Sequence, residues 1–192
     1  DLRCRAAVAL GRIGDTRALE PLITISLSDA DATVREYAKQ SLDSFKSQGK
    51  LPISILLKHL TRWWANPYVS YSLKELGWQP SAEDDRIHNW VAQRDGAKLR
   101  DNWEVVKQVL LQDVDSSAYT TIENALFAFI GIGKPEVISL LLERLSSRGN
   151  KIMAEAYLNC GHEELGVAAR AWAARHGYPV KAGPGAHPIG WG

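Results

Sequence analysis

Aromatic and acidic side chains gather in the middle of this sequence, where together they could act on a nucleobase. Trp63 and Trp64 are adjacent, and three more tryptophans follow before residue 104. An enzyme that excises a base stacks the extruded base on such rings and needs a carboxylate beside them in a basic channel. Asp84, Asp85 and Asp101 could supply that carboxylate, but acids and bases are similar in number here. We favour the interpretation that most of these rings fill a helical core, with Trp63 or Trp64 as an exposed aromatic contact.

The five histidines and two cysteines do not have the spacing of a metal site or of a catalytic pair. The nearest metal-type spacing is Cys160-x-His162, whereas a zinc site needs three or four ligands. The sequence also lacks G-x-S-x-G, the P-loop, H-E-x-x-H and the dinucleotide-binding fingerprint. We therefore identify no catalytic residues and expect no metal and no other cofactor. We therefore expect that this protein is not an enzyme.

The composition is ordinary for a folded soluble protein. Of the 192 residues, 45% are hydrophobic and 23% are charged. The net charge of +1 gives no electrostatic reason to expect nucleic acid or a membrane surface as a partner. No apolar run approaches the roughly 18 residues of a membrane span. Cys4 and Cys160 stand alone, as buried cysteines do in a reducing compartment, so we expect a cytoplasmic location.

The first 45 residues contain a repeat built from short amphipathic helical segments. Four apolar positions of the first segment return 32 residues later, where Leu2, Ala6, Leu10 and Ile13 become Val34, Ala38, Leu42 and Phe45. A fixed period of this size indicates a helical solenoid, in which each unit buries its apolar face by stacking on its neighbours. Cys4, Ala7 and Val8 add a second apolar strip, so we expect the first helix to be covered on two sides.

The same pattern returns further along the chain. Residues 68–76 align with residues 34–42 at an offset of 34, and residues 118–142 align with the first two helices at an offset of 119. We expect a single domain over residues 1–179, truncated at its N-terminus because Asp1 lies within a repeat. Residues 180–192 are rich in Gly and Pro and predict an extended tail, in which Trp191 could anchor a contact.

Three stretches near the N-terminus carry a family resemblance. They are Arg-x-x-Ala-x-x-x-Leu-Gly-x-Ile-Gly-Asp from Arg3 to Asp15, then Ala18-Leu19-x-Pro-Leu-Ile, then Asp29-x-Asp31-x-x-Val34-Arg35. The sequence resembles HEAT repeats, specifically the short bacterial type found in the phycobilisome-lyase group. This resemblance implies an all-α fold, a right-handed α-solenoid of about nine or ten helices.

The resemblance also implies a function, because most such proteins are non-enzymatic scaffolds that bind another protein. The second helix of each pair would line the concave face of the solenoid. The exposed positions expected on that face are Arg5, Arg12, Glu36, Lys39, Asp43 and Lys74. One alternative is attachment of a bilin chromophore, as a phycobilin lyase or a lyase subunit. A further alternative is a HEAT-like DNA glycosylase or another nucleic-acid binder, although nucleic acid is not the partner we expect.

Arg3 and Arg35 recur at equivalent positions of the repeat. They could form a ladder that binds anions. The alternative, which we favour, is that they pair with turn aspartates such as Asp29 or Asp31 and tie adjacent repeats together.

Overall fold

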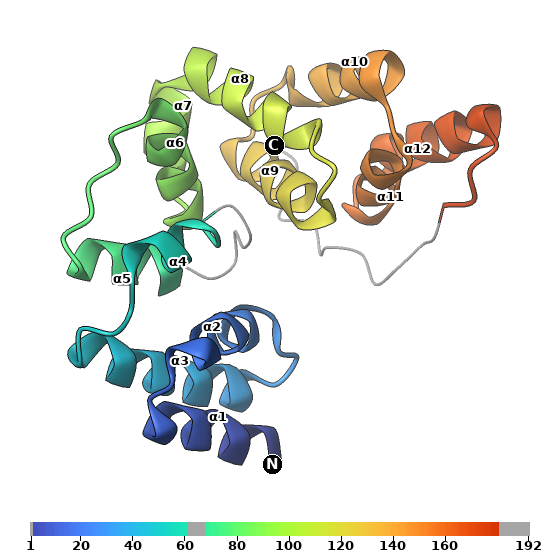
Figure 1. The fold of residues 1–192 in the computed structure, drawn as a ribbon. Helices are drawn as coiled ribbons and strands as arrows, with labels where there is room; N and C mark the ends of the chain where they lie inside the picture. The colour runs from blue at the N-terminus through green and yellow to red at the C-terminus, as the bar shows by residue number, and fades with distance from the viewer. Residues whose placement is uncertain (1, 61–67, 181–192) are drawn as a thin grey trace. The chain divides into compact units, whose positions relative to one another are not determined.

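The computed structural model describes residues 2–60 and 68–180, and every regular element in these ranges is a helix (Figure 1). The predicted all-α helical-repeat fold is therefore confirmed. The chain divides into two compact units, Asp1–Gln79 and Pro80–Gly192, which are described in turn. The single domain expected over residues 1–179 stays a prediction. Of the expected tail, residues 181–192 lie outside the described ranges.

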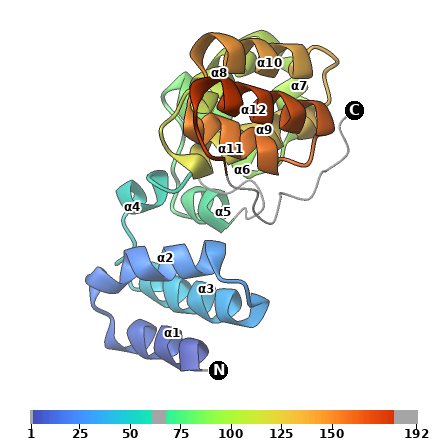
Figure 2. The ribbon, with the colours of Figure 1, turned by 90° about the vertical axis from the view of Figure 1, so that its right-hand side faces the viewer.

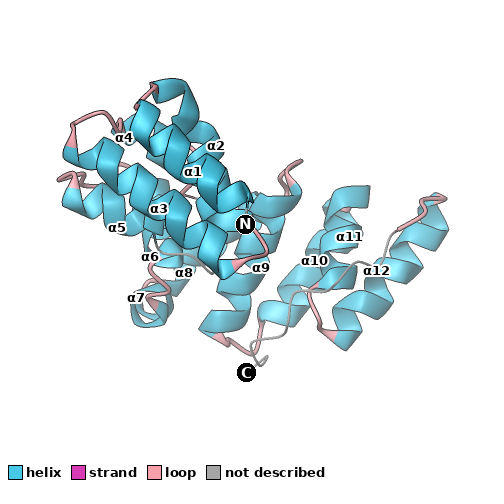
Figure 3. Ribbon diagram, turned by 90° about the horizontal axis from the view of Figure 1, so that it is seen from below, coloured by secondary structure: helices cyan, strands magenta, loops and turns pink. Residues whose placement is uncertain are grey.

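The first unit consists of two helix–helix pairs preceded by a single helix. Its elements are α1 (Leu2–Ile13), a 3₁₀ turn η1 (Thr16–Ala18), α2 (Leu19–Ser28), α3 (Ala32–Ser47), α4 (Ile53–Leu57) and α5 (Tyr68–Glu75). Within this unit α1, α3 and α5 follow one another side by side (Figure 3). Helix α2 packs on α3, and α4 packs on α5 (Figure 2). This alternation is what the repeat predicted.

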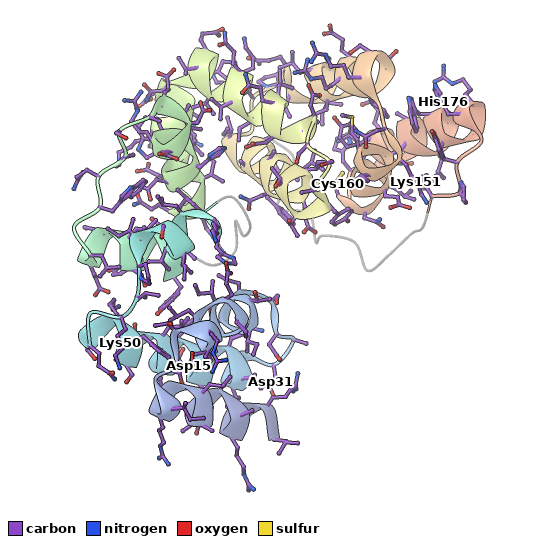
Figure 4. All side chains as sticks on the ribbon, in the orientation of Figure 1. Asp15, Asp31, Lys50, Lys151, Cys160 and His176 are labelled. Carbon is purple, nitrogen blue, oxygen red and sulfur yellow. The ribbon has the colours of Figure 1, made fainter. Side chains whose placement is uncertain are left out.

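Local sequence explains where these helices begin and end. Gly14 follows α1 with a φ of +71°, and Gly133 follows α9 with a φ of +64°. A left-handed residue at this position satisfies the last helical carbonyls, and only glycine adopts it freely. Since these two glycines align at the offset of 119, both copies of the repeat end the helix in the same way. Asp31, labelled in Figure 4, is the N-cap residue of α3, and its side chain accepts a hydrogen bond from the backbone N–H of Thr33.

The second unit is a chain of packed helices. Its elements are α6 (Glu83–Ala92), α7 (Gly96–Asp101), α8 (Trp103–Val114), α9 (Tyr119–Ile132), α10 (Val137–Arg148), α11 (Lys151–Asn159) and α12 (Glu163–His176). Helix α9 lies against α8 and α11, and α12 lies against α10 and α11. Tyr157 is buried, and its hydroxyl donates a hydrogen bond to the carbonyl of Leu141, 3.1 Å away. This bond ties α11 to α10 across the core.

The structure differs from the sequence expectation in how finely the helices are divided. We expected about nine or ten helices, whereas the described residues contain twelve α-helices. The charged stretch after α6 forms the short helix α7. Asp95 caps this helix by accepting a hydrogen bond from the backbone N–H of Lys98, and Leu99 is its buried residue. One capped turn with one buried leucine is too short to show helical periodicity.

Within the described residues α1 is covered on one side, and its coverage on the second side stays a prediction. Cys4, Ala7 and Gly11 face α3 and are buried. On the other side of the helix Leu2 is 81% exposed and Ile13 is 71% exposed. Spacing identifies the residues that share a face of a helix, but it does not identify what covers that face. No other helix of the described residues lies over this side of α1.

Candidate functional site

The candidate site is the surface of the first unit that α1, α3 and α5 form together, here called the α1–α3–α5 face. A close contact between α1 and α3 sets the spacing of this face. Gly11 lies so near Ser41 that a Cβ on Gly11 would stand 2.7 Å from the Ser41 Cβ. The Ser41 hydroxyl also donates a 2.9 Å hydrogen bond to the carbonyl of Ala7. These contacts fix α1 against α3 and so fix the side chains that both helices expose.

The two repeated arginines fasten the same part of the structure. Arg3 donates to both carboxylate oxygens of Asp29, at 2.8 and 2.9 Å. Arg35 donates to the backbone carbonyls of Asp29 and Ala30 in the same turn. The interpretation that these arginines pair with turn aspartates is therefore confirmed for Arg3. The Arg35 side chain binds the same turn, but through the backbone carbonyls of the turn. Both guanidinium groups are engaged by this turn, so the two arginines do not form a row of open anion-binding sites.

A groove of 860 Å³ runs along α1 beside the start of α3. Its lining residues are Cys4, Arg5, Val8, Ala9, Arg12, Ile13, Asp31, Thr33 and Tyr37. The floor of this first groove is apolar, and two guanidinium groups stand along it. Arg5 and Arg12 are exposed, and neither forms a hydrogen bond or an ion pair with any described residue. Both charges remain available to a ligand.

A second groove, of 310 Å³, lies between α3 and α5. Its lining residues are Lys39, Asp43, Lys46, Tyr68, Tyr71, Ser72 and Glu75. Lys46 pairs with Asp43 on its own helix, 2.8 Å away, and with Glu75 on α5. The partial burial of Lys46 disfavours its charge, but its two carboxylate partners outweigh burial and raise its pKa. The Tyr68 hydroxyl donates to Asp43, 3.1 Å away. These charges mainly hold α5 to α3.

The predicted site residues divide between the two grooves. Arg5 and Arg12 line the first groove, and Lys39 and Asp43 line the second. Glu36 is exposed on α3, where its carboxylate lies 3.8 Å from the Lys39 ammonium, and Lys74 is exposed on α5 outside both linings. The structure thus brings four of the six together as two pairs. That they bind a partner stays a prediction.

Sequence reasoning missed two tyrosines as site residues. Tyr37 is 39% exposed in the first groove, and Tyr71 is 66% exposed in the second. Neither hydroxyl has a hydrogen-bond partner among the described residues. They are 34 residues apart, at equivalent positions of the repeat. A large amphipathic side chain repeated outside the buried stripe was the signal that could have identified them.

Of the tryptophans proposed as aromatic contacts, Trp63, Trp64 and Trp191 lie outside the described residues. Trp103 is buried, and its ring meets Phe129 edge-on with centroids 6.1 Å apart. Trp172 is also buried, and its ring stacks with those of His176 and Tyr178. Figure 4 labels His176 at the end of α12. Trp103 and Trp172 therefore belong to the helical core, whereas Trp78 and Trp90 of the central cluster are half-buried.

Within the described ranges, no group of three or more His, Cys, Asp or Glu side chains could hold a metal ion. The second unit has a narrow cleft between α9 and α11, where burial raises the pKa of Glu123 and of Cys160; Figure 4 labels Cys160. Its volume of 10 Å³ is about that of one water-sized probe, too little for a substrate. Asp84 and Asp101 are exposed on α6 and α7.

In the part of the chain that the structure describes, no helix combines the length and the apolar character that crossing a membrane requires.

The fold and the repeated α1–α3–α5 face define an all-α helical-repeat protein. Comparison with protein families agrees with this class. The family model of the PBS lyase HEAT-like repeat matches residues 2–27, which comprise α1, η1 and most of α2. The chain therefore contains a HEAT-like repeat of this type, as the sequence motifs predicted. No curated protein and no solved structure matches the chain significantly.

Proposed function

We propose that this protein is a non-enzymatic scaffold that holds another protein on its α1–α3–α5 face. One observation carries the proposal, namely the contrast between engaged and unengaged polar side chains on this face. Arg3, Arg35 and Lys46 have clear structural partners. Arg5, Arg12 and the hydroxyls of Tyr37 and Tyr71 have none among the described residues.

Exposed arginine and tyrosine are the side chains that protein interfaces favour. Tyrosine offers a large rigid contact with a polar end, and arginine offers five donors that suit carboxylates. Their distribution over three adjacent helices, with the two arginines on α1 and one tyrosine each on α3 and α5, suits an extended protein surface. The two open grooves, of 860 and 310 Å³, add concave relief into which partner side chains fit. The HEAT-like repeat supports the scaffold class without naming the partner.

Affinity capture from a lysate of the source cell, with and without nuclease, tests the proposal. We expect discrete protein partners that survive nuclease and that the triple variant Arg5→Ala, Tyr37→Ala, Tyr71→Ala no longer captures. The matched control is Glu164→Ala, Val167→Ala, Arg170→Ala, which removes three exposed side chains from α12. Capture that depends on nucleic acid, or that the face variant leaves unchanged, would contradict the proposal.

A further inference from the structure

The second groove lies inside the first unit, because α3 has α1 beside it on one side and α5 on the other (Figure 3). Its walls are α3 and α5, and its volume is 310 Å³. Pockets for small ligands begin at about 300 Å³, so the groove suits one long side chain better than a whole helix. The groups that line it indicate which kind of side chain fits.

Two half-exposed carboxylates share one ammonium group in this groove. Lys46 lies 2.8 Å from Asp43 and also pairs with Glu75. The side chains of Asp43 and Glu75 are 49% and 52% exposed, whereas that of Lys46 is 20% exposed. The other lysine of the lining, Lys39, lies 3.8 Å from the carboxylate of Glu36. Because a carboxylate accepts up to about four hydrogen bonds, Asp43 and Glu75 keep exposed acceptor sites for a further cation.

Two polar groups inside the groove also favour a cationic donor. Burial raises the pKa of Tyr68, and the charges of Asp43 and Glu75 raise it further, although the neighbouring Ser72 opposes the shift. These carboxylates therefore make the groove attractive to positive charge. Ser72 is 1% exposed and lines the groove, and its hydroxyl oxygen has no hydrogen-bond partner of normal geometry among the described residues. Buried polar atoms rarely stay unpaired, so an N–H donor that enters the groove would supply the missing partner.

Tyr71 gives the groove an aromatic wall that faces solvent. It is 66% exposed and lines the groove. It stands one helical turn before Glu75, so the ring and the carboxylate share one side of α5. A planar guanidinium stacks on a tyrosine ring while it donates to a carboxylate, whereas a lysine ammonium is a compact, strongly hydrated charge. An arginine side chain is therefore the cation that suits these groups.

We propose that the α3–α5 groove binds an arginine side chain of the partner protein. The guanidinium lies against the Tyr71 ring and donates hydrogen bonds to the carboxylates of Glu75 and Asp43. Lys46 stays between the two carboxylates and holds α5 to α3. This inference rests on the proposed scaffold function and names the chemistry of the partner segment that enters this groove.

Nuclear magnetic resonance titration of the isotope-labelled full chain tests the inference. The probe is a short peptide of glycine and serine with blocked ends and one central arginine. In the first control peptide citrulline replaces the arginine, which keeps the shape and removes the charge, and in the second control glutamate replaces it. We expect saturable amide shifts in α3 and α5 that weaken with added salt, and binding of either control at least about tenfold weaker, equivalent to about 1.4 kcal/mol. Equal binding of the arginine and citrulline peptides would overturn the inference.

Two substitutions locate the binding. Tyr71→Ala removes an exposed ring, and Glu75→Gln removes one charge with little change of shape, so each should weaken binding of the arginine peptide by about threefold or more. Glu143→Gln makes the same change of charge at an exposed position of α10 and should leave binding unaltered. Tyr37→Ala removes the equivalent tyrosine from the first groove and should also leave it unaltered. Far-UV circular dichroism checks that the variants remain folded.

Two further outcomes would overturn the arginine site. One is that Glu143→Gln weakens binding as much as Glu75→Gln, because the attraction would then be a general effect of charge. The other is that the arginine peptide does not bind, while partners captured by the parent chain are still lost from the triple variant of Arg5, Tyr37 and Tyr71. That second result would overturn this inference and leave the scaffold function standing.

Discussion

Single residues set the spacing of the α1–α3–α5 face. No residue larger than glycine fits at position 11 without a shift, because a Cβ there would lie 2.7 Å from the Cβ of Ser41 on α3. Interiors are packed so densely that one added methyl group is felt across such a contact. The position of Arg5 and Arg12 relative to Tyr37 thus depends on a glycine that does not itself meet a ligand.

Gly11→Ala should destabilise the first unit. Overpacking costs about 1–3 kcal/mol, whereas alanine in a helix gains about 1 kcal/mol over glycine, so we expect a net loss of about 1 kcal/mol in urea denaturation. Gly166→Ala in α12 is the control, because its Cβ would meet no atom closer than 3.9 Å. That change should stabilise the protein by up to about 1 kcal/mol. Equal effects of the two substitutions would contradict the close helix contact.

His88 on α6 should make stability depend on pH. Partial burial lowers its pKa, but the hydrogen bond and charge of Asp113 on α8, 2.8 Å away, together with Asp84 and Asp85, raise the pKa overall. A raised folded-state pKa means that this stabilisation is fully present below the unfolded value of about 6.5 and is lost as pH rises through the folded value. We expect His88→Gln to flatten the decline in unfolding free energy above neutral pH, measured by urea denaturation. An unchanged slope would show that the pair contributes nothing.

At the scale of the helix, equivalent positions have different surroundings. Phe45 of α3 is 1% exposed and Ile13 of α1 is 71% exposed, although the repeat aligns them. Phe45→Ala should therefore cost about 3–5 kcal/mol through lost burial and a cavity, whereas Ile13→Ala should change stability by no more than about 0.5 kcal/mol. Thermal and urea unfolding of the two variants measure the difference. A cost for Ile13→Ala close to that for Phe45→Ala would mean that α1 is covered in solution.

The same comparison shows what sequence could and could not predict. The spacing of Leu2, Ala6 and Ile13 correctly predicted a helix that carries them on one side, because periodicity depends only on backbone geometry. The covering of that face depends on which elements lie nearby, so its exposure could not be predicted. The family resemblance predicted Arg5, Arg12, Lys39 and Asp43 as exposed residues of one face, and the structure exposes Arg5, Arg12 and Asp43 but leaves Lys39 half-buried. The division of these four between two grooves depends on how closely α1, α3 and α5 pack.

At the scale of the whole molecule, two helical units share one chain, and the recognised repeat lies in the first. Residues 2–27 match the HEAT-like family model, and the α1–α3–α5 face continues that repeat through α5. The near-neutral net charge of +1 makes general attraction to nucleic acid weak. A local basic helix edge next to exposed tyrosines is better suited to one protein partner.

Hydrogen–deuterium exchange of the protein, alone and in complex with its captured partner, tests the central claim most directly. A bound partner lowers exchange of the backbone amides that it covers or stabilises. We predict slower exchange in peptides from α1, α3 and α5, with the largest change in α1 and with α12 unchanged. Protection confined to the second unit, or spread evenly over both units, would contradict a binding site on the α1–α3–α5 face.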